Sequence, residues 1–343
     1  MSIERPDDIP MGQGDTSRGE ADAARQAGDA AREALEAVRA EIGKVIVGQD
    51  GVVTGLVTAL LVRGHVLLEG VPGVAKTLIV STLARSLDLG STRVQFTPDL
   101  MPSDVLGQTI LDEGGTSFRF REGPVFTNLL LADEVNRTPP RTQAALLEAM
   151  QERQVSVDGA ARPLPDPFLV VATQNPVEHE GTYPLPEAQL DRFLFKLQVP
   201  YPSREQEAAI LARHEAGPEA GDPAQLGVSA VAGATELTAA RHAVQQVRVS
   251  EEVRGYLVDL VRASRDAPAV SLGVSPRGAT MLLHAARAWA WLAGRAFVTP
   301  DEVKAVAKPT LRHRLQLRPE LELEGADADG VLDGLLGSVP VPR

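Results

Sequence analysis

A short glycine-containing segment constrains the fold of this chain more than any other feature. The segment EGVPGVAKT, at 69–77, follows an apolar run at 65–68 and leads directly into the amphipathic stretch KTLIVSTLARSLDLG. A buried strand, a tight loop and a helix in this order bring backbone N–H groups and a helix N-terminus together, and both attract anions. The segment therefore predicts a strand–loop–helix unit that holds the phosphates of a nucleotide.

The side chains of this loop match the chemistry of a phosphate cradle. Gly70 and Gly73 allow the backbone to turn and to approach the phosphates closely. Lys76 would neutralise the β- and γ-phosphates, and the Thr77 hydroxyl would bind Mg²⁺. The predicted nucleotide-binding residues are Gly70, Val71, Pro72, Gly73, Val74, Ala75, Lys76, Thr77 and Leu78. The alternative is a glycine-rich turn with a solvent-exposed lysine.

Ala75 departs from the general pattern G-x-x-x-x-G-K-S/T, which has its second glycine at this position. A methyl side chain is costly only where the backbone needs a positive φ. The alanine is tolerable if it keeps a negative φ, and the departure then lowers the specificity of the pattern without removing the phosphate cradle.

Two acids follow a second apolar run, in the segment LLLADEVNR at 129–137. The carboxyl ends of parallel strands meet at the edge of the sheet where ligands bind. There Asp133 would hold Mg²⁺, and Glu134 would polarise the attacking water. A pair of solvated acids opening a loop is the simpler alternative for this segment taken alone.

Three further residues are candidates with an open alternative each. Asn175 follows the apolar run at 168–172 and would orient water near the γ-phosphate, or simply start a turn before a proline. Arg277 lies in the first turn of a helix, where a cation opposes the helix dipole. Either a bound phosphate offsets this repulsion, or the arginine is simply solvated at a small cost in stability. Arg192, in EAQLDRF, either pairs with Asp191 or a neighbouring helix, or points out of the subunit as an arginine finger.

The order of segments predicts an α/β fold followed by a helical domain. Apolar strands are expected at 65–68 and within RVQFT, NLLLADE, PFLVVATQN and LDRFLFKLQV, alternating with amphipathic helices, which indicates a parallel sheet covered on both faces. Only helices are expected from 203 onward. The predicted parts are a disordered tail at 1–20, a core at 21–202, a helical domain at 203–330 and a C-terminal tail at 331–343. Within the core, an insert is expected near 99–126 and a β-hairpin near 153–165, where QVSVDGAARPLP alternates around an Asp-Gly pair.

Composition limits the partners of the chain. The 343 residues carry a net charge of −12, which argues against nucleic acid or an anionic membrane as the default partner. There is no cysteine, so disulfides and thiolate sites are excluded. No apolar run is long enough to span a membrane and no signal peptide precedes the core, so we expect a cytoplasmic protein without membrane insertion.

Taken together, the motifs closely resemble those of the MoxR family of AAA+ ATPases. GVPGVAKT, QFTPDLMPSDVLG, FREGPVF, LLLADEVNRTPPRTQAALLEAMQE, ATQNP, LPEAQLDRF and SPRG occur in this order, and the resemblance covers about 35–317. The family implies an AAA+ P-loop NTPase core with an all-α lid, and a homo-oligomeric ring that is usually a hexamer. It uses ATP and Mg²⁺, and alanine before the P-loop lysine is usual in it.

The resemblance also implies roles for individual residues. Lys76 and Thr77 correspond to Walker A, Asp133 and Glu134 to Walker B, Asn175 to sensor 1, Arg192 to the finger offered to the next subunit and Arg277 to sensor 2. Gly48 and Gln49 match the segment near the adenine. The inserts of such rings face the pore or the partner, and FRFR at 118–121 alternates like a strand. This strand either grips a substrate or packs one phenylalanine face on its own domain.

The function implied by the resemblance is that of a chaperone-like ATPase ring that remodels, assembles or matures protein partners, often ones with a von Willebrand factor A domain. Three alternatives stay open at this point. They are a nucleic-acid motor or loader, a magnesium-chelatase-like subunit, and a scaffold that binds nucleotide only for assembly. The acidic balance and the Asp133-Glu134 pair argue against the first and the last.

Overall fold

A computed structural model describes the chain except for residues 1–13, 72, 112–116, 175–181, 217–222 and 343. Its strands are β1 (Val66–Glu69), β2 (Ser91–Gln95), β3 (Gly107–Leu111), β4 (Phe118–Glu122), β5 (Leu129–Asp133), β6 (Gln154–Val157), β7 (Ala160–Pro163), β8 (Leu169–Gln174), β9 (Phe195–Gln198), β10 (Val270–Leu272) and β11 (Gln316–Leu317). Its α-helices are α1 (Gly14–Gly43), α2 (Asp50–Leu61), α3 (Lys76–Ser86), α4 (Pro102–Leu106), α5 (Pro140–Glu152), α6 (Glu187–Leu190), α7 (Arg204–Ala216), α8 (Ala234–Gln246), α9 (Glu251–Asp266), α10 (Pro276–Leu292), α11 (Pro300–Leu311), α12 (Pro319–Leu323) and α13 (Ala328–Ser338). Two short 3₁₀ turns are η1 (Val135–Arg137) and η2 (Arg312–Arg314).

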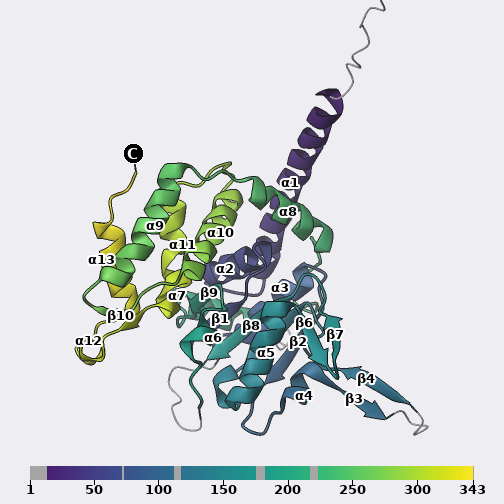
Figure 1. Ribbon diagram of the computed structural model, residues 1–343. Helices are drawn as coiled ribbons and strands as arrows, with labels where there is room; N and C mark the ends of the chain where they lie inside the picture. Colours follow the sequence, from purple (N-terminus) through teal and green to yellow (C-terminus); the bar gives the residue numbers. More distant parts are fainter. Residues whose placement is uncertain (1–13, 72, 112–116, 175–181, 217–222, 343) are drawn as a thin grey trace, which may run out of the picture.

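A five-stranded parallel sheet forms the centre of the first part of the chain, in the order β2-β5-β8-β1-β9 (Figure 1). Its strands overlap the five segments where the sequence predicts them, although β2 begins two residues earlier than expected, and the α/β class is confirmed. In this order β1 is paired with β8 and β9, so the loop after β1 opens at the carboxyl edge beside the ends of β5 and β8. The topology therefore brings the predicted phosphate loop and the predicted acids to one edge.

Both faces of the sheet are buried at its three central strands, β5, β8 and β1, because alternate residues of these strands enter two different hydrophobic clusters. In β5, for example, Leu129 and Leu131 lie in one cluster, whereas Leu130 and Ala132 lie in the other. The first cluster also takes in residues of α2, α3 and the helical domain, and the second those of α5. The near-continuous apolar sequence of the central strands is the pattern expected of a parallel sheet covered on both sides.

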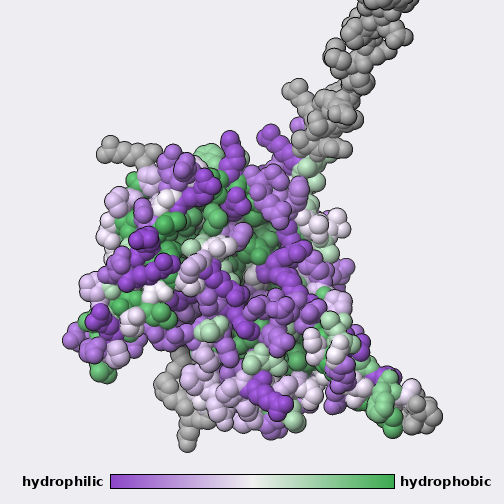
Figure 2. Space-filling model, in the orientation of Figure 1, coloured by the Kyte–Doolittle hydropathy of each residue, from purple (hydrophilic) through white to green (hydrophobic). Residues whose placement is uncertain are grey.

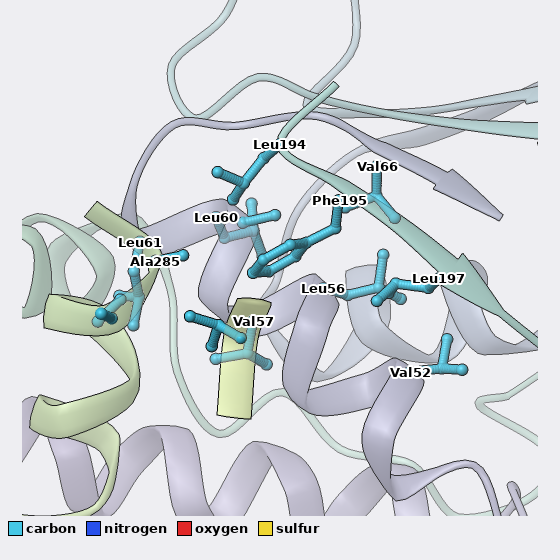
Figure 3. Packing of buried hydrophobic residues seen from close by; sticks show 14 of the residues in the cluster. Val52, Leu56, Val57, Leu60, Leu61, Val66, Leu194, Phe195, Leu197 and Ala285 are labelled. Atoms are coloured by element: carbon cyan, nitrogen blue, oxygen red, sulfur yellow. The ribbon is translucent and has the colours of Figure 1, made fainter. Parts of the chain in front are cut away.

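The helical domain joins the sheet through α2. Val57 and Leu60 of α2 lie with Phe195 of β9 and with Ala285 of α10 in one packed group (Figure 3). All four are buried. Because close-packed interiors transmit displacement, the position of α10 is tied to that of the sheet.

One prediction for the helical domain is wrong, since it contains strands. β10 and β11 pair in antiparallel fashion, with Val270 opposite Leu317. These strands have three and two residues, too few to give the period-two alternation by which strands are recognised in a sequence.

Both predicted tails differ from the structure. α1 begins at Gly14 rather than near 21, so that part of the span predicted as disordered is helical. Extending an established helix adds one hydrogen bond per residue, which suffices to carry it beyond its Ala-rich part. The span 331–343 is not simply a tail either, because α13 continues to Ser338 and buries Leu332 and Leu335, and Val339 directly after the helix is buried too. Glycines between the apolar residues concealed this helix in the sequence.

Two β-hairpins leave the core. β3 and β4 pair in antiparallel register within the span of the predicted insert, and β6 and β7 do so at 153–165 around Asp158 and Gly159, both at positive φ. The first hairpin projects from the body (Figure 1). Phe120 packs edge-on against Phe126. The Arg162 guanidinium of the second hairpin lies 4.1 Å from the centre of the Phe120 ring. Phe118 points away and is 77% exposed.

Candidate functional site

The predicted phosphate loop connects β1 to α3, with Gly73 in the left-handed region at φ 86°. At Gly70 a Cβ atom would lie 2.7 Å from the Val199 carbonyl oxygen, so only glycine fits this close approach to the end of β9. The loop thus lies against the sheet edge with its glycines at positions that require them. Pro72 lies outside the described residues.

Ala75 does not keep a negative φ. It has φ 60° and ψ 23° and is the N-cap of α3. The chain needs a left-handed residue here to turn from the loop into the helix, and alternating left-handed residues point successive N–H groups into one concavity. This conformation costs alanine about 1–2 kcal/mol of free energy, so the loop carries backbone strain at the predicted site.

Lys76 is half-buried at the start of α3. Its Nζ donates a hydrogen bond to the Gly70 carbonyl oxygen at 2.7 Å, across the loop. Burial lowers the pKa of Lys76, while the negative charges of Asp133 and Glu134 raise it. The ammonium group is therefore within electrostatic reach of both acids that end β5.

Asp133 has a donor on each carboxylate oxygen. Oδ1 accepts a hydrogen bond from the Thr173 hydroxyl at 2.6 Å, and Oδ2 accepts from Nη2 of Arg93 at 2.6 Å. Nε of Arg93 donates to the same oxygen at 3.2 Å. The carboxylate is thus oriented by side chains from the two strands that flank β5.

Glu134 is held in a left-handed backbone conformation, with φ 56°. Its N–H donates to the Thr173 hydroxyl at 2.8 Å. Its Oε2 accepts from Nε2 of Gln95 at 2.6 Å and forms an ion pair with Nε of Arg137 at 3.0 Å. Non-glycine residues at positive φ are concentrated at functional sites, where the surrounding structure fixes them.

Sequence reasoning missed the four partners of these acids: Arg93, Gln95, Arg137 and Thr173. Arg93 and Gln95 point from one face of β2, and Gln95 is opposite Asp133 in the register of the two strands. Only the strand order shows this, because β2 and β5 are separated by the whole insert. Arg137 could have been found from the sequence, since it lies only three residues after Glu134, in a short 3₁₀ turn.

The oxygen atoms at this edge suit Mg²⁺. A carboxylate and a hydroxyl, such as those of Asp133 and Thr77, are the hard ligands that this ion takes together with substrate phosphates. Asp133 is the last residue of β5, and its side chain is 14% exposed. The residues present therefore fit the ion that the nucleotide would bring.

A pocket of about 230 Å³ lies beside the loop, where a nucleotide base would be expected. Its walls come from the segment after α1, from the loop, and from the region of α7, and they include Val45, Ile46, Gln49, Val74, Leu78 and Ile210. Gln49 is buried, and its amide donates to the Pro200 carbonyl oxygen at 3.3 Å. Gly48 lines a neighbouring pocket with Gln49. An apolar slot with few polar groups is typical of a small-molecule site.

Arg192 and Arg277 lie together, at the other edge of the sheet. They line one pocket of about 300 Å³ with Arg63, Arg153 and His284. Arg63 precedes β1, whereas the phosphate loop follows it, and a four-residue strand separates the two edges by roughly 13 Å. Among the described residues neither Arg192 nor Arg277 forms an ion pair with a carboxylate, and Asp191 pairs with Arg314 instead.

Asn175 lies outside the described residues. It follows Gln174, the last residue of β8. β8 lies between β1 and β5, so its carboxyl end faces the same edge as the phosphate loop.

Comparison with known proteins agrees with this geometry. The chain matches the ATPase family associated with various cellular activities (AAA) over residues 65–195 and the AAA lid domain over residues 262–333. It is 43% identical to the chaperone MoxR1 of Mycobacterium tuberculosis, over 88% of this chain and 81% of that protein. The chain belongs to the MoxR family of AAA+ ATPases. The helical domain of this MoxR protein is thus an AAA+ lid.

Two further similarities extend over nearly the whole MoxR fold. The uncharacterized protein YeaC of Bacillus subtilis is 47% identical over 88% of this chain and 92% of its own length. The crystal structure of a Cytophaga hutchinsonii protein has a TM-score of 0.87 and 40% identity, covering 94% of this chain and 99% of that one. Of the described helices, none is both long and apolar enough to cross a bilayer.

Proposed function

We propose that this MoxR protein binds ATP with Mg²⁺ and hydrolyses it to ADP and phosphate. One observation carries the proposal, namely that the strand order brings the loop with Lys76 and the acids at the end of β5 to the same carboxyl edge of the sheet. A loop lysine next to a helix N-terminus and a strand ending in two acids is the arrangement that phosphoryl transfer to water requires.

Each residue of the site has a defined task in this reaction. The loop N–H groups and Lys76 hold the β- and γ-phosphates, and Gln49 lies at the pocket for the base. Thr77 and Asp133 bind Mg²⁺, which supplies charge neutralisation at the phosphate oxygens when bound. Glu134 accepts a proton from the attacking water, and Asn175 orients that water.

Glu134 must leave its present partners to act as a base. Its Oε2 is engaged by Gln95 and Arg137. The attacking water must therefore compete with these two side chains for the carboxylate of Glu134.

The site is completed by a neighbouring subunit. Arg192 and Arg277 lie at the edge opposite the phosphate loop, too far to reach the phosphates of their own subunit. A head-to-tail contact places this edge of one subunit against the loop of the next, and repetition of the contact closes a ring, which we take to be a hexamer. There the two guanidinium groups neutralise charge in the transition state, a role that contributes about 10³–10⁵ in rate where it has been measured.

The partner of the ring is a protein rather than a nucleic acid. The end of the β3–β4 hairpin exposes Leu111 and Phe118, and apolar surface gathers there (Figure 2). An apolar patch at the end of a projecting element fits a protein surface, and the net charge of −12 repels a polyanion. We propose that the ring remodels or matures protein partners, including ones with a von Willebrand factor A domain, as a chaperone does.

Two variants test this function. Glu134→Gln should bind ATP with normal affinity but turn it over at least about 100-fold more slowly, because only the proton acceptor is lost. Glu152→Gln, at the exposed end of α5, is the matched control and should retain full activity. Full hydrolysis by Glu134→Gln would contradict the assignment, and normal ATP affinity of Lys76→Ala would contradict the phosphate loop.

A further inference from the structure

A buried arginine of the lid reaches into the segment that carries Arg192. Arg314 ends the 3₁₀ turn η2, and its side chain is 1% exposed. Its Nε forms an ion pair with Oδ1 of Asp191 at 2.7 Å, and its Nη2 donates to the Asp191 carbonyl oxygen at 3.1 Å. Nη1 and Nη2 also donate to the carbonyl oxygens of Leu194 and Phe193. One guanidinium group thus fixes the backbone on both sides of Arg192.

The same carboxylate is connected to the helix that carries Arg277. Oδ2 of Asp191 accepts a hydrogen bond from the Ser275 hydroxyl at 3.2 Å. Ser275 is the N-cap of α10 and accepts from the Gly278 N–H at 3.1 Å. Asp191 is therefore shared between Arg314 and the first turn of α10, two residues before Arg277.

The arrangement is more than a stabilising ion pair. Taking the arginine out of water costs several kcal/mol, so its pair with the partly exposed Asp191 contributes little net stability compared with apolar side chains. The planar fork of arginine does give geometric precision, because its donors have fixed directions. Burial lowers the pKa of Arg314 to about 10, which leaves the group charged at neutral pH.

We propose that Arg314 is a positioning residue, which acts through Asp191 and Ser275 to hold Arg192 and Arg277 as one rigid unit against the neighbouring subunit's nucleotide. The inference rests on the proposed function, since it presupposes that these two arginines act between subunits. Arg314 itself does not touch the nucleotide. A displacement of about 1 Å in such a unit can lower a rate by a factor of about 100.

A mixture of two inactive variants separates this role from general stability. The donor subunit carries Lys76→Ala, so it holds no nucleotide but presents its arginines. The acceptor subunit carries Arg192→Ala and keeps its phosphate loop. In a mixed ring only contacts in which a donor faces an acceptor can hydrolyse ATP. Arg314→Lys, which keeps the charge but loses the fork, is then placed in one partner at a time.

We expect Arg314→Lys in the donor to reduce the restored kcat by about 10–100-fold with the KM for ATP unchanged. The same change in the acceptor should leave the restored rate intact, because the arginine pair of that subunit is already disabled. Asp191→Asn in the donor should act like Arg314→Lys. Arg312→Lys is the matched control, since Arg312 lies in the same turn but pairs with Asp329 inside the lid.

Each other outcome overturns the inference. An undiminished rate with the altered donor shows that Arg314 does not position the pair, while the shared site stands. If Arg314→Lys lowers the restored rate equally in the donor and in the acceptor, its role is purely structural. If the Arg314→Lys donor does not assemble, the Asp191→Asn donor decides by the same criteria. A mixture without any restored activity, before Arg314 is changed, contradicts the shared site and the inference with it.

Discussion

Replacement of Ala75 by glycine should not destabilise the protein, although the same substitution destabilises most helices. Ala75 is exposed and has φ 60°. An L-residue pays about 1–2 kcal/mol for this conformation and glycine does not. Glycine in turn loses about 0.5–1 kcal/mol more backbone entropy on folding. The two contributions leave Ala75→Gly about 0–1.5 kcal/mol more stable than the parent.

Ala208→Gly is the matched control for this prediction. Ala208 is an exposed residue inside α7, where the backbone is helical, so glycine should cost about 1 kcal/mol there. Urea unfolding followed by circular dichroism measures both variants, and their free energies of unfolding should differ by about 1–2.5 kcal/mol. Equal destabilisation of the two would show that Ala75 is not left-handed, and would refute the strained loop.

Three further predictions follow from the contacts around the site. Arg93→Gln should lower the Mg²⁺ concentration needed for half-maximal ATPase activity, because Arg93 competes with the ion for Oδ2 of Asp133. Arg254→Gln, in α9, is the control. An unchanged Mg²⁺ dependence of Arg93→Gln would rule out the competition. As the pH is lowered from 6.5 to 4, the protonation of His65 should reduce the free energy of unfolding by up to about 1.4 kcal/mol per pH unit. His65→Gln should remove this contribution to the slope. Burial, aided by Arg153 and opposed by the Met150 carbonyl, lowers the pKa of His65 to about 4. The unfolded chain therefore binds the proton more tightly, and the contribution of His65 to stability is complete only above pH 6.5. An identical pH slope in the variant would contradict this. Phe120→Ser should destabilise the protein by about 1–2 kcal/mol, because it loses the contacts with Phe126 and Arg162. Phe118→Ser should change the free energy of unfolding by no more than about 0.5 kcal/mol in the same assay. Equal effects would mean that the ring of Phe120 does not pack as observed.

The sequence predicted those parts of the molecule that depend on neighbouring residues along the chain. The three central strands of the sheet appear as apolar runs, and the position of Lys76 and Thr77 after a glycine loop, at the start of a helix, follows from the local sequence. Asp133 and Glu134 were found for the same reason, since Asp133 ends a buried strand and Glu134 directly follows it.

What the sequence did not reveal depends on which segments become neighbours in space. The contact of Arg93 with Asp133 exists only because β2 lies next to β5. Arg314 reads as one of several basic residues in a turn, and its burial against Asp191 follows from the docking of the lid. The left-handed backbone of Ala75 was missed for a different reason, because the cost of that conformation argued against it and the turn into α3 outweighed that cost.

The completion of the site by a neighbouring subunit is tested most directly by the ATPase rate of an equimolar mixture of Lys76→Ala and Arg192→Ala. Each variant alone should be inactive, one without a phosphate grip and the other without the guanidinium offered to its neighbour. If subunits exchange at random in a head-to-tail ring, about a quarter of the contacts join a donor to an acceptor. The mixture should therefore recover about a quarter of the rate of the unaltered protein, whereas a rate that stays at the level of the separate variants would contradict the shared site.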